Sequence, residues 1–281
     1  MILVKMSKTN LLRVLNSVRR KQYVGGKPFD QVTSCDLRVG EGEISVTTLV
    51  KDGKTSVCHF VMDVDDAEDT VNITVPDIDR LVGVLSAHGQ NIKITTKENK
   101  IIVKSSNKQT TLLSDPEALA YAHSSHTIGE WSKLSDERAA SISTGDSPAY
   151  TLSDGSKREP ILSVGVSPDE LYEAVRCDSM NSQKLNRYTL DYQDSAVSVI
   201  VGDTLKGQTR STLDAEIISL LDDVPFDWSF EGGLEFILQQ WTGYDENCVI
   251  HFFDFRPEGQ GIRILIMLPD TKSWVFQAGV L

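Results

Sequence analysis

The chain has 281 residues, of which 40% are hydrophobic and 24% are charged, and its formal net charge is −12. This length predicts one large domain or two medium domains, and the hydrophobic share is sufficient for a packed core. No run of 18 or more apolar residues occurs, which excludes a transmembrane helix, and the N-terminus turns polar too early for a secretory signal. We therefore expect a cytoplasmic protein that makes no membrane contact.

The net negative charge arises in the second part of the sequence. Residues 1–114 carry 16 Lys and Arg against 13 Asp and Glu, whereas residues 115–281 carry 12 against 27. The first acidic residue is Asp30, and seven basic residues precede it: Lys5, Lys8, Arg13, Arg19, Arg20, Lys21 and Lys27. A basic segment in an acidic chain predicts a protein that repels polyanions in general but binds one on a particular surface.

The first 114 residues contain the patterns of two helices and several strands. A short strand over residues 2–5 precedes a helix over residues 7–20, whose apolar residues recur at helical spacing. A second helix begins after its N-cap, Asp77, and ends near residue 88, before Gly89. Alternating or β-branched runs predict strands at 34–39, 44–49, 55–62, 71–75, 91–95, 100–105 and 109–113.

Residues 115–160 have a different composition, rich in Ser, Ala, Gly and Asp. This composition is typical of an interdomain connector, in which we expect a short helix around residues 135–142. The connector either carries a contact with a partner or is a plain surface loop, and the sequence leaves both readings open.

The remaining residues repeat the order of the first part. A strand over 161–166 leads into a helix from Pro168 to about residue 177, and a second helix covers residues 231–241. The predicted strands lie at 188–192, 196–201, 209–217, 248–253, 262–267 and 273–280. The offset of roughly 155–160 residues indicates a duplicated domain. We therefore expect an α+β protein with domains at 1–114 and 161–281 and a connector at 115–160.

The first predicted helix has one apolar and one basic face. At 100° per residue, Leu11 and Leu15 fall on the apolar side, and Arg13 and Arg20 stack two turns apart on the opposite side. That polar side contains no carboxylate, although a structural helix in an acidic protein usually offers arginines an acidic neighbour one turn away. The missing partners favour contact with an external polyanion; a merely solvated face is the alternative.

The positive charge declines along the other three helices. The second helix presents Arg80 beside Gly83 and Ala87, and the third presents Arg176 together with Glu173. The fourth presents no basic residue at all. Flexible cations without clustered Asn, Gln and Arg predict phosphate contacts that are independent of base sequence and weakened by salt.

Several segments, in a fixed order, resemble a known family. Residues 75–86, 91–94, 100–103 and 113–116 (VPDIDRLVGVLS, NIKI, KIIV and LSDP) resemble the second half of the first domain in T-even-type phage clamps. The opening MSKTNLL (6–12) is similar to the start of that family, and VSPDEL (166–171) to the helix entry of its second domain. The chain thus resembles two-domain DNA polymerase sliding clamps, or processivity factors, a class that includes PCNA.

The resemblance implies a fold and a function. Two-domain clamps close as homotrimers into rings, with antiparallel β-sheets outside and two short helices of each domain facing a central pore. They encircle duplex DNA, tether the replicative DNA polymerase to give processivity, and are placed by a clamp loader. We therefore expect no catalytic activity, no cofactor and no metal. A phage-encoded clamp would be a viral protein that acts in the host cytoplasm.

The resemblance also assigns candidate site residues. The DNA-binding candidates are basic residues on or after the helices: Lys8, Arg13, Arg20, Arg80, Arg176, Lys184 and Arg187. Lys5 and Lys21 are secondary candidates. Clamp partners insert a short hydrophobic peptide into a groove between the connector and the C-terminal sheet. The apolar candidates for that groove are Trp131, Leu268, Pro269, Trp274 and Phe276, and their alternative role is the hydrophobic core.

No enzymatic or metal-binding pattern competes with this interpretation. His123 and His126 have a metal-like spacing but lack nearby Cys or carboxylate ligands, and the acidic run at 63–69 lacks the glycine and final glutamate of a calcium loop. Gly232-Gly233 alone is a weak phosphate signal, and GxGxxG, Walker and GxSxG motifs are absent. One alternative is a β-rich structural or assembly protein, such as a virion component, that does not encircle DNA. A second alternative is a checkpoint- or repair-type clamp in place of a replicative one.

The four cysteines also fit an intracellular protein. They are Cys35, Cys58, Cys177 and Cys248, and no two of them have the spacing of a metal or redox motif. We expect buried free thiols.

Overall fold

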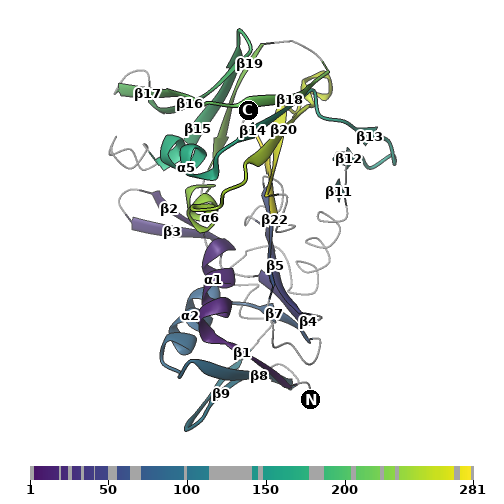
Figure 1. The fold of residues 1–281 in the computed structure, drawn as a ribbon. Helices are drawn as coiled ribbons and strands as arrows, with labels where there is room; N and C mark the ends of the chain where they lie inside the picture. The colour runs from purple at the N-terminus through teal and green to yellow at the C-terminus, as the bar shows by residue number, and fades with distance from the viewer. Residues whose placement is uncertain are drawn as a thin grey trace. The chain divides into compact units, whose positions relative to one another are not determined.

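The computed structural model describes most of the two predicted repeats. The described residues are 3–18, 20–24, 27–32, 35–40, 42–49, 56–63, 71–97, 100–113, 141–144, 148–176, 187–203, 207–221, 225–231, 234–268 and 273–279. The chain divides into two compact units, which Figure 1 colours from purple to yellow along the sequence. Unit 1 comprises Met1–Arg19, Val32–Gly53 and Val57–Ala139, and unit 2 comprises Arg20–Gln31, Lys54–Ser56 and Ala140–Leu281.

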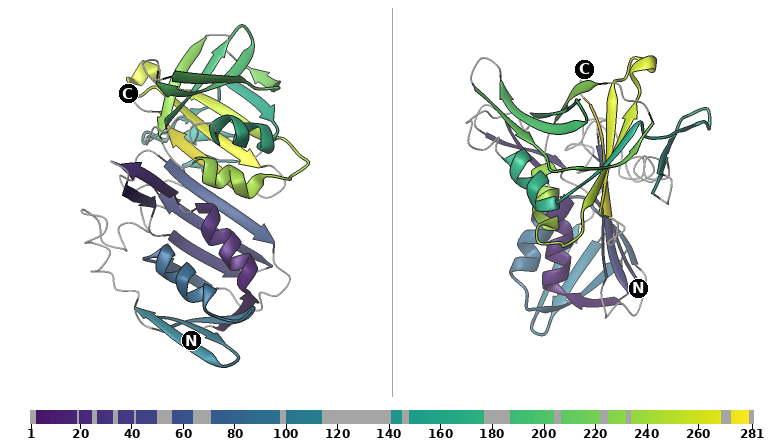
Figure 2. Two further views of the ribbon diagram at one scale, coloured as in Figure 1. Left: turned by 90° about the vertical axis from the view of Figure 1, so that its left-hand side faces the viewer. Right: turned by 45° about the horizontal axis from the view of Figure 1, so that its top comes forward.

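Unit 1 combines antiparallel strands with two helices. One sheet has the order β1-β8-β9-β10 and a second run of strands has the order β6-β5-β4-β7. The strands are β1 (Leu3–Ser7), β4 (Cys35–Gly40), β5 (Glu43–Leu49), β6 (Ser56–Asp63), β7 (Val71–Val75), β8 (Asn91–Lys97), β9 (Lys100–Ser105) and β10 (Lys108–Leu113). The helices are α1 (Lys8–Val18) and α2 (Ile78–Ser86), which pack against each other (Figure 2).

The apolar stripes of both helices form the core of unit 1. Leu11, Val14 and Leu15 of α1 are fully buried, as the sequence periodicity predicts, and α1 packs on β5. Leu81 and Leu85 of α2 are also buried. The strands β8 and β9 contribute Ile92, Ile94, Ile101 and Val103 at alternating positions, so one face of each of these strands lies in the core.

Unit 2 repeats this plan. Its strands run in the orders β18-β14-β20-β21-β22 and β17-β16-β15-β19, and its helices α5 (Pro168–Arg176) and α6 (Leu234–Trp241) pack against each other. The strands are β14 (Leu162–Val166), β15 (Arg187–Gln193), β16 (Ala196–Asp203), β17 (Gly207–Thr212), β18 (Glu216–Leu220), β19 (Phe226–Glu231), β20 (Cys248–Asp254), β21 (Ile262–Leu268) and β22 (Ser273–Ala278). A 3-10 turn, η2 (Arg256–Glu258), joins β20 to β21.

The two units share one strand order. In unit 1 the strand before the first helix, β1, pairs with β8, followed by β9 and β10. In unit 2 the strand before α5, β14, pairs with β20, followed by β21 and β22. All of these pairs are antiparallel. The predicted α+β duplication, with antiparallel sheets and two short helices in each copy, is confirmed.

The largest departure from the sequence prediction follows the first helix. The prediction extended this helix to Arg20, but α1 ends at Val18 and Arg20 begins β2 (Arg20–Val24), which pairs with β3 (Lys27–Val32). The stacking of Arg13 and Arg20 on one helical face is therefore wrong. Tyr23 and Val24 are β-formers, and the Gly25-Gly26 pair after them is a turn signal that the helical periodicity concealed.

Smaller differences concern the second repeat and the connector. The single strand predicted at 209–217 is two strands, β17 and β18, and β19 was not predicted. The end of the connector forms a small sheet of β11 (Ile142–Ser143), β12 (Ala149–Thr151) and β13 (Lys157–Arg158). The helix predicted around residues 135–142 lies outside the described residues, except that Ile142 is in β11.

Some predicted features fall in the undescribed part of the chain. These are the pair His123 and His126, most of the acidic run at 63–69, and Gly232-Gly233. Within the described ranges, no group of three or more His, Cys, Asp or Glu residues could hold a metal ion. In the same ranges, no helix has the length and apolar character needed to cross a membrane.

Two of the four cysteines lie in the described ranges. Cys35 and Cys248 are buried free thiols, as predicted. Burial, together with the neighbouring Asp36 carboxylate, raises the pKa of Cys35, and burial raises the pKa of Cys248 to about 12. Both side chains are therefore neutral thiols at physiological pH.

Candidate nucleic-acid interface

Helix α1 presents one exposed arginine on the side opposite its buried stripe. Arg13 is exposed, whereas the flanking Val14 and Leu15 are fully buried. The helix contains no acidic residue in its first turn or elsewhere. Arg13 can therefore contact an anion without competition from a carboxylate on its own helix.

Helix α2 presents a second exposed arginine. The carboxylate of Asp77 caps the helix by accepting a hydrogen bond from the backbone N–H of Arg80, with an N–O distance of 2.8 Å. The cap confirms the predicted helix start. The exposed Gly83 follows Arg80 one turn later, and a Cβ placed there would meet no atom within 4 Å. No side chain projects from α2 at Gly83, so a bulky polyanion has access to the surface beside Arg80.

Lys8 has a structural contact in addition to any role toward DNA. Its Nζ donates a hydrogen bond of 2.9 Å to the carbonyl oxygen of His88, just after α2. The His88 ring contacts the hydroxyls of Ser105 and Thr110 at 3.0 and 2.9 Å. Burial and the Lys108 and Lys8 ammonium groups lower the pKa of His88, so the ring is neutral at physiological pH.

Helix α5 carries the cation of unit 2, and that cation has an acidic neighbour. Arg176 is exposed and forms an ion pair of 2.9 Å with Glu173 one turn earlier. Its guanidinium also lies 5.6 Å from the centre of the Tyr172 ring. Part of the Arg176 charge is therefore already balanced by a carboxylate on its own helix.

Helix α6 presents no basic residue, as the sequence predicts. Leu234, Ile237, Leu238 and Trp241 form its buried stripe. Glu235 is half-buried, and burial raises its pKa. The helical cations of the described structure are therefore concentrated in unit 1.

Two of the remaining DNA-binding candidates are the first residues of strands. Arg20 begins β2, and Arg187 begins β15, where its backbone is opposite Glu231. Lys184 lies outside the described residues. Of the seven candidates, the structure places Lys8 and Arg13 on α1, Arg80 on α2 and Arg176 on α5.

The described members of the predicted peptide groove are buried. Leu268, Trp274 and Phe276 are 1%, 6% and 5% exposed. Phe276 stacks against Tyr150 of β12, with ring centres 5.1 Å apart. Trp131 and Pro269 lie outside the described residues. A peptide would reach Phe276 only after Tyr150 had moved away.

A cluster of aromatic rings and arginines holds the connector end against the β20–β21 turn of unit 2. The ring of Tyr150 also meets Phe255 edge-on at 5.5 Å, and the Arg263 guanidinium lies 4.1 Å from the centre of Phe255 and 5.1 Å from that of Tyr150. Arg158 of β13 lies 5.1 Å from the Phe255 ring centre. Such stacked contacts fix the position of the β12–β13 segment.

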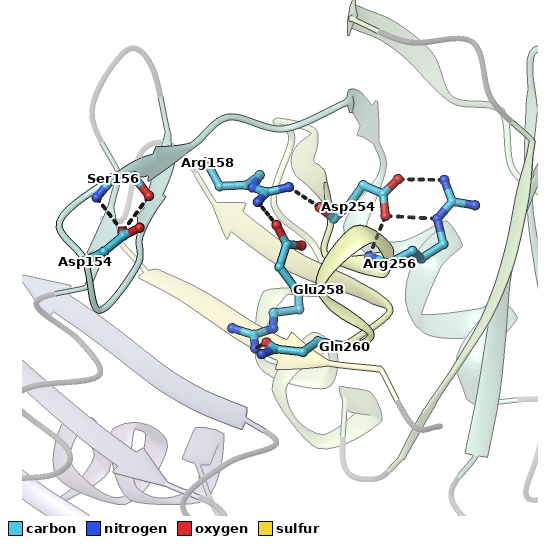
Figure 3. A network of polar contacts seen from close by, with 8 residues as sticks. Asp154, Ser156, Arg158, Asp254, Arg256, Glu258 and Gln260 are labelled. Atoms are coloured by element: carbon cyan, nitrogen blue, oxygen red, sulfur yellow. Dashed lines mark hydrogen bonds and ion pairs between the residues drawn. The ribbon is translucent and has the colours of Figure 1, made fainter.

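Polar contacts reinforce this attachment (Figure 3). Arg158 donates a hydrogen bond of 2.8 Å to the Asp254 carbonyl oxygen and forms an ion pair with Glu258. Arg256 binds the Asp254 carboxylate through Nε and Nη2 at 2.9 and 2.7 Å. The hydrogen bond from Arg256 lowers the pKa of Asp254. The turn closes at Gly259, which has a left-handed φ of 69°.

Sequence reasoning missed two surfaces. It did not single out Tyr150 and Arg158, because both lie in the segment interpreted as a plain connector. It also missed the exposed aliphatic residues on and after β18, namely Ile217, Ile218, Leu220 and Leu221. The signal for the second surface was present in the sequence, since IISLL is an apolar run on a short strand.

No family model and no curated protein matches this sequence, but solved structures do. A putative DNA polymerase III beta subunit from Eubacterium rectale matches with a TM-score of 0.63 at 12% identity, over 100% of this chain and 66% of that one. The PCNA of A. fulgidus, bound to the C-terminal region of FEN-1, matches with a TM-score of 0.57 at 12% identity, over 100% and 99%. The Helicobacter pylori beta clamp bound to a DNA ligase peptide matches with a TM-score of 0.57 at 12% identity, over 99% and 66%.

These matches show the fold of the chain. It has the duplicated architecture of sliding clamps, as predicted, and it spans 66% of the beta subunit and beta clamp but nearly the whole of PCNA.

Proposed function

We propose that this chain, which has the sliding-clamp fold, encircles duplex DNA and tethers a replicative DNA polymerase, without catalytic activity of its own. The observation that carries the proposal is the end-to-end match with a PCNA, over 100% of this chain and 99% of that one. A clamp loader and a polymerase are the partners that this function requires.

DNA contact is assigned to the helices. Arg13 and Arg80 are exposed on two helices that pack side by side in unit 1. Arg176, which is paired with Glu173, adds an exposed cation from α5 of unit 2. The contacts are to phosphates and independent of base sequence, so salt weakens them.

Ring closure is assigned to a homotrimer. A chain of two clamp domains needs three copies to give the six domains of a ring, and a ring needs a head-to-tail interface between two different edges of each copy. Unit 2 offers β18, the end strand of its sheet, all five residues of which are exposed. Unit 1 offers β10, the end strand of the sheet β1-β8-β9-β10.

The β18 edge has the chemistry of a protein interface. Ile218 and Leu221 are 55% and 69% exposed, and Ile217 and Leu220 are 38% and 40% exposed. An unpaired edge strand with exposed aliphatic side chains is an aggregation hazard unless another strand covers it. The acidic Asp214 and Glu216 beside this edge complement Lys108 on β10.

The oligomeric mass in solution tests the ring. We expect a species of about 93 kDa, three times the 31.1 kDa chain, by light scattering. Ile218→Asp with Leu221→Asp should shift it to monomer, because carboxylates in a buried edge contact are strongly unfavourable. Glu246→Asp, on the exposed turn after α6, is the matched control and should remain trimeric. A wild-type monomer at all concentrations would contradict the trimer and favour a structural or assembly protein.

Partner recognition is assigned to unit 2 and the connector. One structural match is bound to the C-terminal region of FEN-1 and another to a DNA ligase peptide. We propose that a polymerase peptide binds here as well, near Trp274 and Phe276. If so, Tyr150→Ala should tighten peptide binding, because it removes the ring that stacks on Phe276. Unchanged binding after Phe276→Ala would place the groove elsewhere.

A further inference from the structure

The sheet β1-β8-β9-β10 carries two rows of lysines, and each row consists of one lysine of β8 and the lysine opposite it on β9. Lys93 and Lys97 on β8 and Lys100 and Lys104 on β9 are all exposed. The backbone register places Lys93 directly opposite Lys104, and Lys97 directly opposite Lys100. Residues directly opposite each other, and residues two or four apart on one strand, share a face of the sheet. These four lysines therefore form one surface, here named the lysine face.

The other face of the same strands lies in the core. Ile92 and Ile94 of β8 are 1% and 0% exposed, and Ile101 and Val103 of β9 are 2% and 0% exposed. The lysine face is thus the solvent side of the sheet. It belongs to elements other than α1 and α2, which carry Arg13 and Arg80.

Within the described part of the chain, no acidic side chain compensates the charges of the lysine face. The four strands contain no Asp or Glu, and Glu98 is the only acidic residue between positions 91 and 113. Among the described residues, no side chain forms an ion pair with Lys93, Lys97, Lys100 or Lys104. Like charges directly opposite each other destabilise a sheet, so these pairs favour an external anion.

Protection of a sheet edge does not explain these lysines. Natural proteins place lysines on edge strands to prevent aggregation. However, β8 and β9 are the two inner strands of the order β1-β8-β9-β10. Their lysines stand in the middle of the sheet surface, where edge pairing cannot occur.

The residues between the two rows indicate the kind of partner. Thr95 is 2% exposed and Ile102 is half-buried, so no large apolar or aromatic side chain stands out from the described part of this face. A protein partner usually needs such anchors at the centre of its interface. Phosphates need only flexible cations.

We propose that the lysine face binds the sugar-phosphate backbone of a nucleic acid, independently of base sequence. This site is additional to the helical DNA contacts of the proposed function, and it does not require a closed ring. Four phosphate contacts predict that duplex affinity at this site falls by about 150-fold between 50 and 200 mM salt.

The test compares two double variants of the full chain that remove the same charge. Lys93→Gln with Lys104→Gln removes one row. Arg38→Gln with Lys157→Gln is the control, because the exposed Arg38 lies on β4, outside this sheet, and the exposed Lys157 lies in unit 2. Fluorescence anisotropy measures the binding of a 30-base-pair duplex and a 30-nucleotide single strand between 50 and 200 mM NaCl.

The row variant should lose roughly 10-fold or more in affinity and about two from the slope of log affinity against log salt, whereas the control should stay near wild type. Lys97→Gln with Lys100→Gln should reproduce the loss, and thermal melts check that each variant is folded. Loss with either probe supports the site, and the difference between the probes identifies duplex or single strand as its source.

Three outcomes would overturn the inference. The row variant and the control could weaken binding equally, which would indicate a general charge effect. Binding could depend only on Arg13 and Arg80, which would leave the proposed function intact but remove this site. Alternatively, polyglutamate could bind through Lys93 and Lys104 while DNA binding did not depend on them, which would assign the face to an acidic protein.

Discussion

The sheets β1-β8-β9-β10 and β14-β20-β21-β22 have the same strand order, but their outer faces differ in charge and in burial. Counting from Ser7 and Ser167, which precede α1 and α5, Lys93 corresponds to Val249 and Lys104 to Met267. On the same face of unit 2, Leu265 and Phe276 are buried, and Tyr150 stacks on Phe276. On the corresponding face of unit 1, Lys93 and Lys104 are exposed, although Thr95 near them is only 2% exposed.

This difference shows what a duplicated fold leaves free to vary. An antiparallel sheet needs only one buried face, so its second face can meet water or another part of the chain. Unit 2 uses that face to hold the β12–β13 segment, whereas in unit 1 the same face carries the four exposed lysines. The core face is the same in both units, with Ile94 and the corresponding Ile250 both 0% exposed.

The largest expected effect concerns Phe276 and its counterpart, Thr111. Phe276→Ala should lower the free energy of unfolding by about 3–5 kcal/mol, because it leaves a cavity beneath Tyr150. Thr111→Ala removes an exposed side chain at the corresponding position and should change stability by less than about 0.5 kcal/mol. Urea unfolding measures both. Equal losses would mean that the two outer faces do not differ in burial.

The second effect is the pH dependence that His251 on the outer face of unit 2 contributes to stability. His251 is buried against Ser163, at 2.8 Å between Nδ1 and Oγ, and burial lowers its pKa from 6.5 to about 4. The folded state therefore disfavours the proton, and stability present above pH 6.5 is lost as the pH falls toward 4. The expected loss between neutral pH and pH 5 is about 2 kcal/mol.

The variant His251→Gln isolates this contribution, since Gln can still bond Ser163 but does not titrate. Its unfolding free energy should depend less on pH than that of the wild type, by about 2 kcal/mol between pH 7 and pH 5. Identical pH profiles of the two proteins would show that His251 is not the titrating group. In unit 1 the corresponding residue, Thr95, has no titratable group.

The third effect compares the helical cations of the two units. Arg13→Gln with Arg80→Gln should reduce the slope of log DNA affinity against log salt by about two, one for each lost phosphate contact. Arg176→Gln should reduce it by less than one, because Glu173 already neutralises Arg176. Salt titrations of duplex binding give both slopes. A larger effect at Arg176 would reverse the assignment of DNA contact to unit 1.

The smallest effect concerns the attachment of β13. Arg158→Ala removes an ion pair with Glu258 and a hydrogen bond to the Asp254 carbonyl. Because these groups are partly exposed, the expected loss is only about 1 kcal/mol, or roughly 2–4 °C in Tm. The neighbouring exposed Lys157, replaced by Ala, should leave Tm unchanged. A shift as large for Lys157→Ala would argue against a specific attachment.

Most of the fold could be predicted from the sequence, because its elements have clear periodicity. The N-cap at Asp77 and the strands at 71–75 and 100–105 match the structure. The failure at Arg20 has a physical cause: the basic residues 19–21 are compatible with a helix, whereas Tyr23 and Val24 favour the strand β2, which pairs with β3. The split of β17 from β18 also escaped prediction, since both halves are strand-like.

The site was less predictable, because it depends on contacts between distant residues. Arg13 and Arg80 could be found from helical faces alone. The i,i+3 spacing of Glu173 and Arg176 is visible in the sequence, but only the structure shows that the two side chains form an ion pair. Tyr150 on Phe276 joins residues more than 120 positions apart, and Lys93 opposite Lys104 requires the strand register. Neither could be read from local patterns.

The central claim is that this chain encircles duplex DNA, and a threading experiment without a loader tests it directly. Duplex DNA is tethered to a bead at one end, incubated with the protein, and then closed at the free end by a bulky block. After a wash in high salt, which removes phosphate contacts, a ring should be retained on blocked DNA and released when a nuclease cuts the DNA. Protein that washes off blocked and open DNA alike, or that stays after the cut, would contradict the claim.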